Sequence, residues 1–247
     1  DHHSIVGDNW SPSLNLSHAL SDTLTLKAGI ARAYKAPNLY QLNSDYLLYS
    51  RGQGCYGQST SCYLQGNDKL KAETSVNKEL GLEYKADGWV AGLTYFRNDY
   101  KNKVESGLAP VSHASGGSGA YRNSAIYQWE NVPKALVEGL EGTLTIPLAS
   151  QLTWNNNFTY MLQSKNKETG DYLSVTPRYT LNSMLDWQAT QDLSLQATVA
   201  WYGQQTPKKY DYHGDRVTGS ATQQLAPYAI AGVSGTYALT RNLSLTA

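Results

Sequence analysis

Apolar and polar residues alternate with a period of two along most of the chain. Leu14, Leu16 and Leu20 fall on even positions between small or polar neighbours, and the alternation resumes at Leu24 after a Ser-Asp pair. This period is typical of β-strands with two unlike faces. We expect about ten strands and no helix. The expected strands cover residues 10–20, 24–31, 74–85, 89–103, 124–147, 152–165, 172–188, 193–203, 226–238 and 243 onward.

The connections between these strands alternate between short and long. Short turns and long loops on opposite sides of long antiparallel strands are typical of an outer-membrane barrel. A soluble β-sandwich also alternates, but its strands are usually shorter and its loops less one-sided. The pattern therefore favours an all-β antiparallel transmembrane barrel over a sandwich. The long connections cover residues 37–73, 104–123, 166–171 and 204–225.

Aromatic residues mark both ends of the apolar face. One group lies near the short turns, and a second lies some eight residues farther along the strands, which is typical of the girdles at the two edges of a lipid-facing band. The opposite face is polar and predicts a wet or protein-filled interior. The two aromatic groups are Tyr84, Trp89, Trp154, Trp187 and Tyr237, and then Tyr95, Tyr160, Tyr179 and Trp201. The polar face carries Lys27, Lys35, Asn77, Glu79, Glu83, Asn155, Asn157, Arg178 and Asp186.

The amino-acid composition excludes further classes of protein. Of 247 residues, 16% are charged, and 20 basic residues balance 20 acidic ones. This neutrality argues against a nucleic-acid partner, which requires a basic footprint. The 19 Tyr and 6 Trp against 2 Phe suit surfaces that are half apolar and half wet. No apolar run is long enough for a membrane-spanning helix, so strands are left as the spanning elements.

Motifs for catalysis and for metal binding are missing from the sequence. It contains no zinc-protease HExxH motif, no phosphate-binding Walker loop and no dinucleotide fingerprint. The five histidines form no metal-ligand spacing. We expect no catalytic residue, no metal site and no cofactor.

The longest loop holds the only two cysteines, Cys55 and Cys62. A zinc pair would need further ligands nearby, and none is evident. In an oxidising compartment the two would form a disulfide that fixes the loop tip, and two free thiols are the alternative.

The same loop carries an isolated cation among tyrosines. Arg51 is the only charged residue between residues 46 and 67, with Tyr49 and Tyr56 close by. Arginine pairs with anionic oxygens and also stacks on rings, which suits an anionic aromatic ligand. A solvated loop cation is the alternative. Lys208 and Lys209 in the last long loop form a second candidate patch, with the same alternative.

Three segments resemble TonB-dependent outer-membrane receptors. Residues 30–43 (IARAYKAPNLYQLN) are similar to the Lys-Ala-Pro strand end of this family, and residues 70–84 (LKAETSVNKELGLEY) to its Leu-Lys-x-Glu-Thr strand start. Residues 131–144 (NVPKALVEGLEGTL) are similar to its Val-x-Gly-x-Glu strand. With residues 49–56 (YSRGQGCY) added, the whole chain resembles the ferric enterobactin and related catecholate siderophore receptors.

The resemblance implies a barrel of about 22 strands, of which residues 1–247 are a part. The plug, its TonB box and the last strand are expected outside this chain. It also implies an outer-membrane receptor that captures a ferric catecholate siderophore and imports it with energy from TonB. Iron would be carried only inside the siderophore complex. Arg51 and Gln53 match the loop positions that would contact the catecholate.

Other functions stay open at this point. A passive porin-like channel would lack the three family motifs, and an outer-membrane enzyme would need converging Asp/His or Ser/His groups. A receptor for haem or a vitamin is compatible with the fold. Which catecholate is carried is not decided by the residues.

Three further cations fall on the apolar register of consecutive strands. Arg32, Lys78 and Arg97 each lie about eight or nine residues from a short turn, at the expected upper edge of the lipid band. We expect them to form a basic ledge for lipopolysaccharide phosphates. Simple snorkelling of long side chains to the interface is the alternative.

Overall fold

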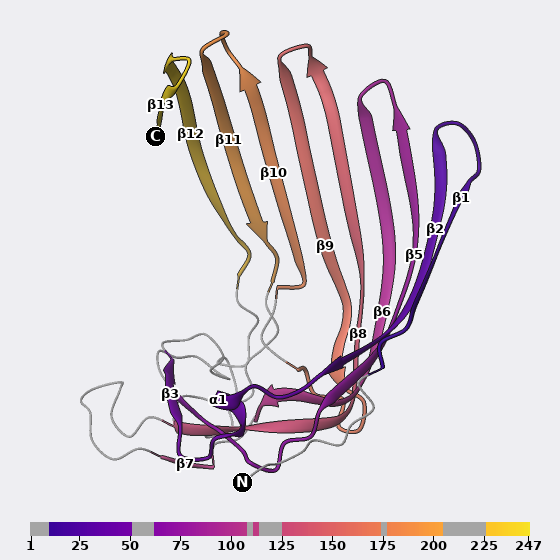
Figure 1. The fold of residues 1–247 in the computed structure, drawn as a ribbon, viewed down its shortest axis with the longest axis vertical. Helices are drawn as coiled ribbons and strands as arrows, with labels where there is room; N and C mark the ends of the chain where they lie inside the picture. The colour runs from indigo at the N-terminus through magenta and orange to yellow at the C-terminus, as the bar shows by residue number, and fades with distance from the viewer. Residues whose placement is uncertain (1–9, 51–61, 108–110, 114–124, 174–176, 205–225) are drawn as a thin grey trace.

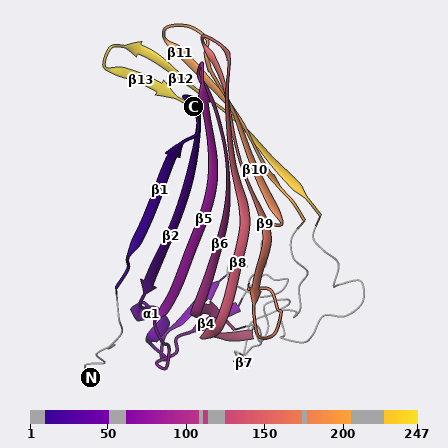
Figure 2. The same cartoon turned by 90° about the vertical axis from the view of Figure 1, so that its right-hand side faces the viewer.

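The computed structural model describes residues 10–50, 62–107, 111–113, 125–173, 177–204 and 226–247. Ten strands form one continuous curved sheet in which chain neighbours pair, and its two edges stay open (Figures 1 and 2). Three short strands and one helical turn lie at the end of the sheet away from the tight turns. The main strands are β1 (Ser13–Ala19), β2 (Leu24–Lys35), β5 (Glu73–Ala86), β6 (Trp89–Ser106), β8 (Ala125–Ala149), β9 (Leu152–Asn166), β10 (Tyr179–Gln188), β11 (Leu193–Tyr202), β12 (Tyr228–Thr240) and β13 (Leu243–Thr246).

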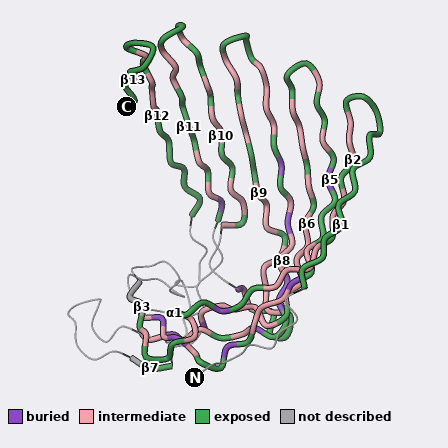
Figure 3. The backbone as a smooth tube through the Cα atoms, viewed as in Figure 1, coloured by how far each residue is buried: buried purple, intermediate pink, exposed green. Residues whose placement is uncertain are grey.

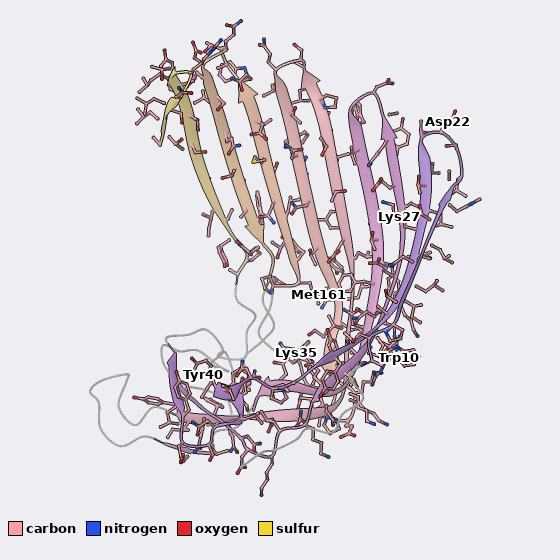
Figure 4. The ribbon with its side chains drawn as sticks, in the orientation of Figure 1. Trp10, Asp22, Lys27, Lys35, Tyr40 and Met161 are labelled. Atoms are coloured by element: carbon pink, nitrogen blue, oxygen red, sulfur yellow. The ribbon has the colours of Figure 1, made fainter. Side chains whose placement is uncertain are left out.

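Every pairing along this path is antiparallel, as the sequence predicts. Tight turns connect the strands at one end, and Asp87 and Gly88 at the β5–β6 turn both have positive φ, at 52° and 82°. Asp and Gly accept this left-handed geometry more readily than most residues. Figure 4 places Asp22 at the turn end of the sheet, and Lys35 and Tyr40 at the opposite end.

The two faces of the sheet differ as alternation requires. One face exposes large apolar side chains, including Leu80 and Leu93, together with the aromatic residues predicted for the girdles, such as Trp89 and Trp187. The other face is polar: Lys27 Nζ lies 3.0 Å from Glu83 Oε2, and Asn155 donates to Asp186 at 3.3 Å. Few of the described side chains of the main sheet are buried, because it has no second layer.

Burial is concentrated instead at the loop end (Figure 3). Tyr127 is 1% exposed and Leu64 4%, and Val132 and Ala135 of β8 form a buried cluster with Leu173. The loop end of the sheet therefore has a packed core, which the membrane-spanning part of the sheet lacks among its described residues.

Two short strands lie inside the long loop that the sequence was expected to leave without strands. These are β3 (Leu47–Ser50) and β4 (Cys62–Gln65), and β4 pairs with β8 in parallel, with Tyr63 opposite Ile126. β7 (Ser112–His113) pairs antiparallel with β8. The expectation of antiparallel pairing alone is therefore wrong at β4, which runs parallel to the first residues of β8 at the loop end of the sheet.

Helix α1 (Leu39–Leu42) also contradicts the expectation of no helix. Asn38 Oδ1 accepts from the Gln41 backbone at 2.8 Å, and Gln41 Oε1 accepts from the Asn38 backbone at 3.1 Å. This reciprocal capping box satisfies both backbone donors and stabilises a single turn.

The expected strand over residues 172–188 begins only at Tyr179. Tyr172 makes an isolated bridge to Lys165, and Pro177 has no backbone N–H for the ladder. The remaining main strands agree with the expected ranges to within a few residues, and β2 and β6 extend four and three residues farther from the turns than expected.

Candidate ligand-binding site

The base of the β3–β4 hairpin is held firmly at the loop end of the sheet. Gly66 N donates to Tyr46 O at 3.2 Å, and Gln128 Nε2 on β8 donates to Gly66 O at 3.3 Å. Asn67 Nδ2 donates to Trp129 O at 3.0 Å. These bonds add to the parallel β4–β8 ladder, so the hairpin is fixed to the wall strand β8.

Gly66 is required by a close backbone approach. A Cβ at this position would lie 1.9 Å from the backbone oxygen of Asn43, far inside contact distance. Only a residue without a side chain lets the α1–β3 segment cross β4 here.

The predicted ligand residues lie in β3 and in the sequence directly after it. Tyr49 lies in β3 with its backbone paired to Tyr63. Arg51, Gln53 and Tyr56 follow directly, in residues 51–61, which lie outside the described residues. The structure therefore fixes where this segment leaves and re-enters the fold, and the contacts of these side chains stay predictions.

The cysteine pair and the second patch also fall partly or wholly outside the described residues. Cys62 is the first residue of β4, whereas Cys55 lies in the undescribed tip. Lys208 and Lys209 lie in the undescribed segment 205–225. The disulfide and the lysine patch stay predictions.

A charged cluster that the sequence did not predict lies below the hairpin, on the inner face. Lys103 Nζ lies 3.3 Å from Glu105 Oε1 and 3.6 Å from Glu73 Oε1, and 4.4 Å from the ring centre of Tyr100. Glu73 also accepts from the backbone of Val104 at 3.0 Å. The cluster joins the ends of β5 and β6 where the wall meets the loop region.

Asn102 is the reason this cluster points inward. Its φ of 55° breaks the alternation of β6, and Asn131 Nδ2 holds its carbonyl at 2.8 Å. Arg97 and Asp99 lie on the apolar face, but Lys103, two strand periods after Asp99, contacts the inner-face residue Glu73 and also pairs with Glu105. The sequence signal was an Asn between two lysines, which is a weak marker of left-handed backbone.

The cluster lies beyond the membrane band, and burial together with the neighbouring charges shifts the pKa values of Glu105 and Lys103. Burial raises the pKa of Glu105, although the charge of Lys103 opposes the shift. Burial lowers the pKa of Lys103, but the negative charges of Glu105 and Glu73 outweigh that effect and leave its pKa raised. Lys103 therefore stays protonated between two carboxylates.

The three cations of the expected ledge occupy the apolar register but differ in their partners. Lys78 is directly opposite Arg97, while Arg32 is opposite Val76 and so lies two residues farther from the turns than Lys78. Arg97 Nε lies 3.2 Å from Asp99, and Arg32 Nη1 donates to the Trp10 carbonyl at 2.5 Å. The three do not form the single row that the sequence suggested, because β2 and β5 pair with Ile30 opposite Lys78.

Neither a metal site nor a spanning helix is found in the described parts of the chain. No group of three or more His, Cys, Asp or Glu residues is arranged to hold an ion there. No helix in those ranges is long and apolar enough to cross a bilayer.

A family model for the TonB-dependent receptor-like β-barrel matches residues 1–247. The chain belongs to this family. The described geometry fits a β-barrel of this family, with a curved sheet of long strands, tight turns at one end and structured loops at the other. Receptors of this family are outer-membrane proteins, and this chain is part of one.

Several relatives of the receptor are named for their cargo. The chain is 84% identical to a ferric enterobactin receptor of Pseudomonas aeruginosa over 247 residues, covering all of this chain and 33% of the relative. It is 60% identical to the ferrienterobactin receptor of Escherichia coli, covering 32% of that protein. The crystal structure of a variant of the Pseudomonas receptor superposes with a TM-score of 0.73 over 99% of this chain and 35% of the other. The chain spans about one third of the length of the curated relatives it matches.

Proposed function

We propose that this chain is the part of an outer-membrane receptor that captures a ferric catecholate siderophore on its β3–β4 hairpin. The observation that carries the proposal is the identity of 84% across the entire chain with a ferric enterobactin receptor, hairpin included. The geometry supports it, since the hairpin is anchored to β8, Tyr49 lies in β3, and Arg51, Gln53 and Tyr56 follow β3 directly in the sequence.

Solved structures of the Pseudomonas receptor add support from the ligand side. One variant with an arginine replaced by alanine, and another with a glutamine two positions farther replaced, were each solved with enterobactin. Arg51 and Gln53 have the same Arg-x-Gln spacing. A ferric tris-catecholate is anionic and exposes flat rings, which a guanidinium pairs with and stacks on. Lys208 and Lys209 are the second candidate contact.

Import would then depend on partners outside this chain. A plug inside the complete barrel would receive the complex and pass it on when TonB acts on the plug. The iron travels only within the siderophore, and the protein holds no cofactor of its own. No reaction is catalysed, so the receptor is a transporter and not an enzyme. Lipopolysaccharide of the outer leaflet surrounds the barrel and is a further partner.

A competition experiment tests the cargo. The full-length receptor should bind ferric enterobactin in preference to haemin, although a haemin receptor of Yersinia enterocolitica is also a relative, at 26% identity. Equilibrium quenching of the intrinsic tryptophan fluorescence reports binding of either compound. Tighter binding of haemin than of the ferric catecholate would overturn the proposal.

A further inference from the structure

The outer face of the sheet carries two pairs of cations directly opposite each other on neighbouring strands. Lys78 on β5 is opposite Arg97 on β6, and Lys101 on β6 is opposite Lys134 on β8. Strand alternation puts all four on the face that exposes Leu80 and Leu93. Like charges directly opposite each other destabilise an antiparallel pair, so this face contains two adjoining repulsive contacts.

The nearby carboxylates Asp99 and Glu138 neutralise Arg97 and leave the three opposed lysines without a counter-charge from the described part of the chain. Asp99 lies 3.2 Å from Arg97 Nε and 2.5 Å from Lys167 Nζ. Glu138 lies 3.8 Å from Arg97 Nη1 and accepts hydrogen bonds from Gln163 at 3.0 Å and from Tyr95.

Three exposed lysines of this face have no acidic partner among the described residues. Lys78, Lys101 and Lys134 have no ion pair with any residue in the described parts of the chain. Arg97, by contrast, is fixed by Asp99 and Glu138. The outer face therefore presents one oriented guanidinium and three unneutralised ammonium groups on β5, β6 and β8.

The height of these groups on the barrel points to the headgroup layer. Arg97 lies eight residues from Trp89 at the tight turn, which at about 3.3 Å per residue and a tilt near 40° is a rise of roughly 20 Å. Lys101 is four residues farther, at roughly 30 Å. An apolar band about 25 Å tall ends between them, so the two pairs straddle its upper edge.

We propose that the Lys78–Arg97 and Lys101–Lys134 pairs form a binding site for the phosphate groups of lipopolysaccharide in the outer leaflet. A phosphate between Lys101 and Lys134 turns their repulsive contact into an attractive one, and a phosphate beside Lys78 supplies the counter-charge that this lysine lacks. The site rests on the proposed function only for the placement of the barrel in the outer membrane. Arg32, whose guanidinium is held at the Trp10 carbonyl, lies at its margin.

The test compares two double variants of the full-length receptor. Lys101→Gln/Lys134→Gln removes the upper pair, and Lys69→Gln/Lys71→Gln removes two exposed loop lysines as a control of equal charge. Because each lysine near an anionic surface contributes about fivefold in affinity, the first variant should bind purified lipopolysaccharide about 25-fold more weakly than wild type. The control should bind it as wild type does.

Thermal unfolding in a zwitterionic detergent gives a second readout. Without lipid, Lys101→Gln/Lys134→Gln should melt at or above the wild-type temperature, because a repulsive contact has been removed. Addition of lipopolysaccharide should raise the melting temperature of wild type more than that of the variant. Dephosphorylated lipopolysaccharide should remove this difference, which identifies the phosphates as the bound group.

Three results would overturn the site: unchanged lipopolysaccharide affinity in the variant, an equal loss in the control, or undiminished binding of the dephosphorylated lipid. Ferric enterobactin binding is measured on the same samples and should be unchanged in both variants. Failure of the siderophore assay in wild type would contradict the proposed cargo, and it would leave the lipid result readable on its own.

Discussion

Arg51 supplies the one fixed charge on the hairpin tip, so its replacement has the largest expected effect on capture. Loss of a charge-assisted contact costs about 1.5–3 kcal/mol, or roughly 10- to 150-fold in affinity. Arg51→Ala in the full-length receptor should weaken binding of ferric enterobactin by this factor. Arg51→Lys should restore part of it, since lysine keeps the charge but loses the planar surface. Gln53→Ala should have a smaller effect, because its hydrogen bond is uncharged.

The barrel itself is the control for this series. The substituted residues directly follow β3, which lies at the loop end of the sheet, so the melting temperature of each variant should equal that of wild type. Unchanged affinity in Arg51→Ala, with the hairpin still ordered, would return Arg51 to a solvated loop cation and move the contact to Lys208 and Lys209.

At the residue scale, the sequence could predict which face a side chain occupies but not which partner it meets. The alternation correctly placed Lys27 and Glu83 on the polar face. It could not show that Asn102 reverses the alternation of β6, because a left-handed residue leaves no periodic signal. Nor could it show that Lys101 and Lys134 are opposed, since their separation along the chain gives no register.

At the scale of single elements, Gly66 is the position where a small change should release the hairpin. Gly66→Ala would force the backbone of Asn43 away and should destabilise the hairpin by about 1–3 kcal/mol, as overpacking usually does. Hydrogen exchange of the Leu64 and Tyr127 amides in the full-length receptor should become faster, while β10 and β11 keep their protection. Gly232→Ala, where a new Cβ would meet only a threonine hydroxyl at 3.2 Å, is the matched control. Equal exchange in both variants would show that the close approach at Gly66 does not hold the hairpin.

The expected Cys55–Cys62 disulfide belongs to the same element. It would close a short ring, so its stabilisation should be local and at most about 2–3 kcal/mol. Its effect on binding would come from ordering the tip before the ligand arrives. Mass spectrometry of unreduced peptides should show one cross-linked pair, and two alkylatable thiols would reject the prediction.

The elements that the sequence failed to predict are those formed by distant pairing. Short strands such as β3 and β4 are too brief for alternation to be visible, and the parallel contact of β4 with β8 depends on residues more than sixty positions apart. Helix α1 could have been found, since Asn38 followed by Gln41 is a capping-box signature. The long wall strands were predictable because one face of each is apolar throughout.

At the scale of the whole molecule, the ten-stranded sheet is an open structure with two unpaired edges, β1 and β13. Unpaired backbone groups are not tolerated in the hydrocarbon region. Residues 1–247 expressed alone should therefore not insert stably into outer-membrane vesicles, whereas the full-length receptor should. The measurement is resistance to urea extraction and to protease. A monomeric, cooperatively folded fragment in aqueous solution would contradict this prediction.

The parallel contact between β4 and β8 also divides the folding of the receptor into two steps. The wall is built from hairpins between chain neighbours, which form early because little loop entropy is lost. Tyr63 reaches Ile126 only after β5 and β6 and the far end of β8 are in place, since the register of β8 is set by β6. The barrel is thus expected to be assembled before its external face can recognise anything, and pulse-labelled hydrogen exchange should find Leu64 and Tyr127 protected later than β5 and β6. A newly inserted receptor should therefore close its barrel before its loops can select a ligand. The delay between the two events is the time that the parallel β4–β8 ladder needs to form.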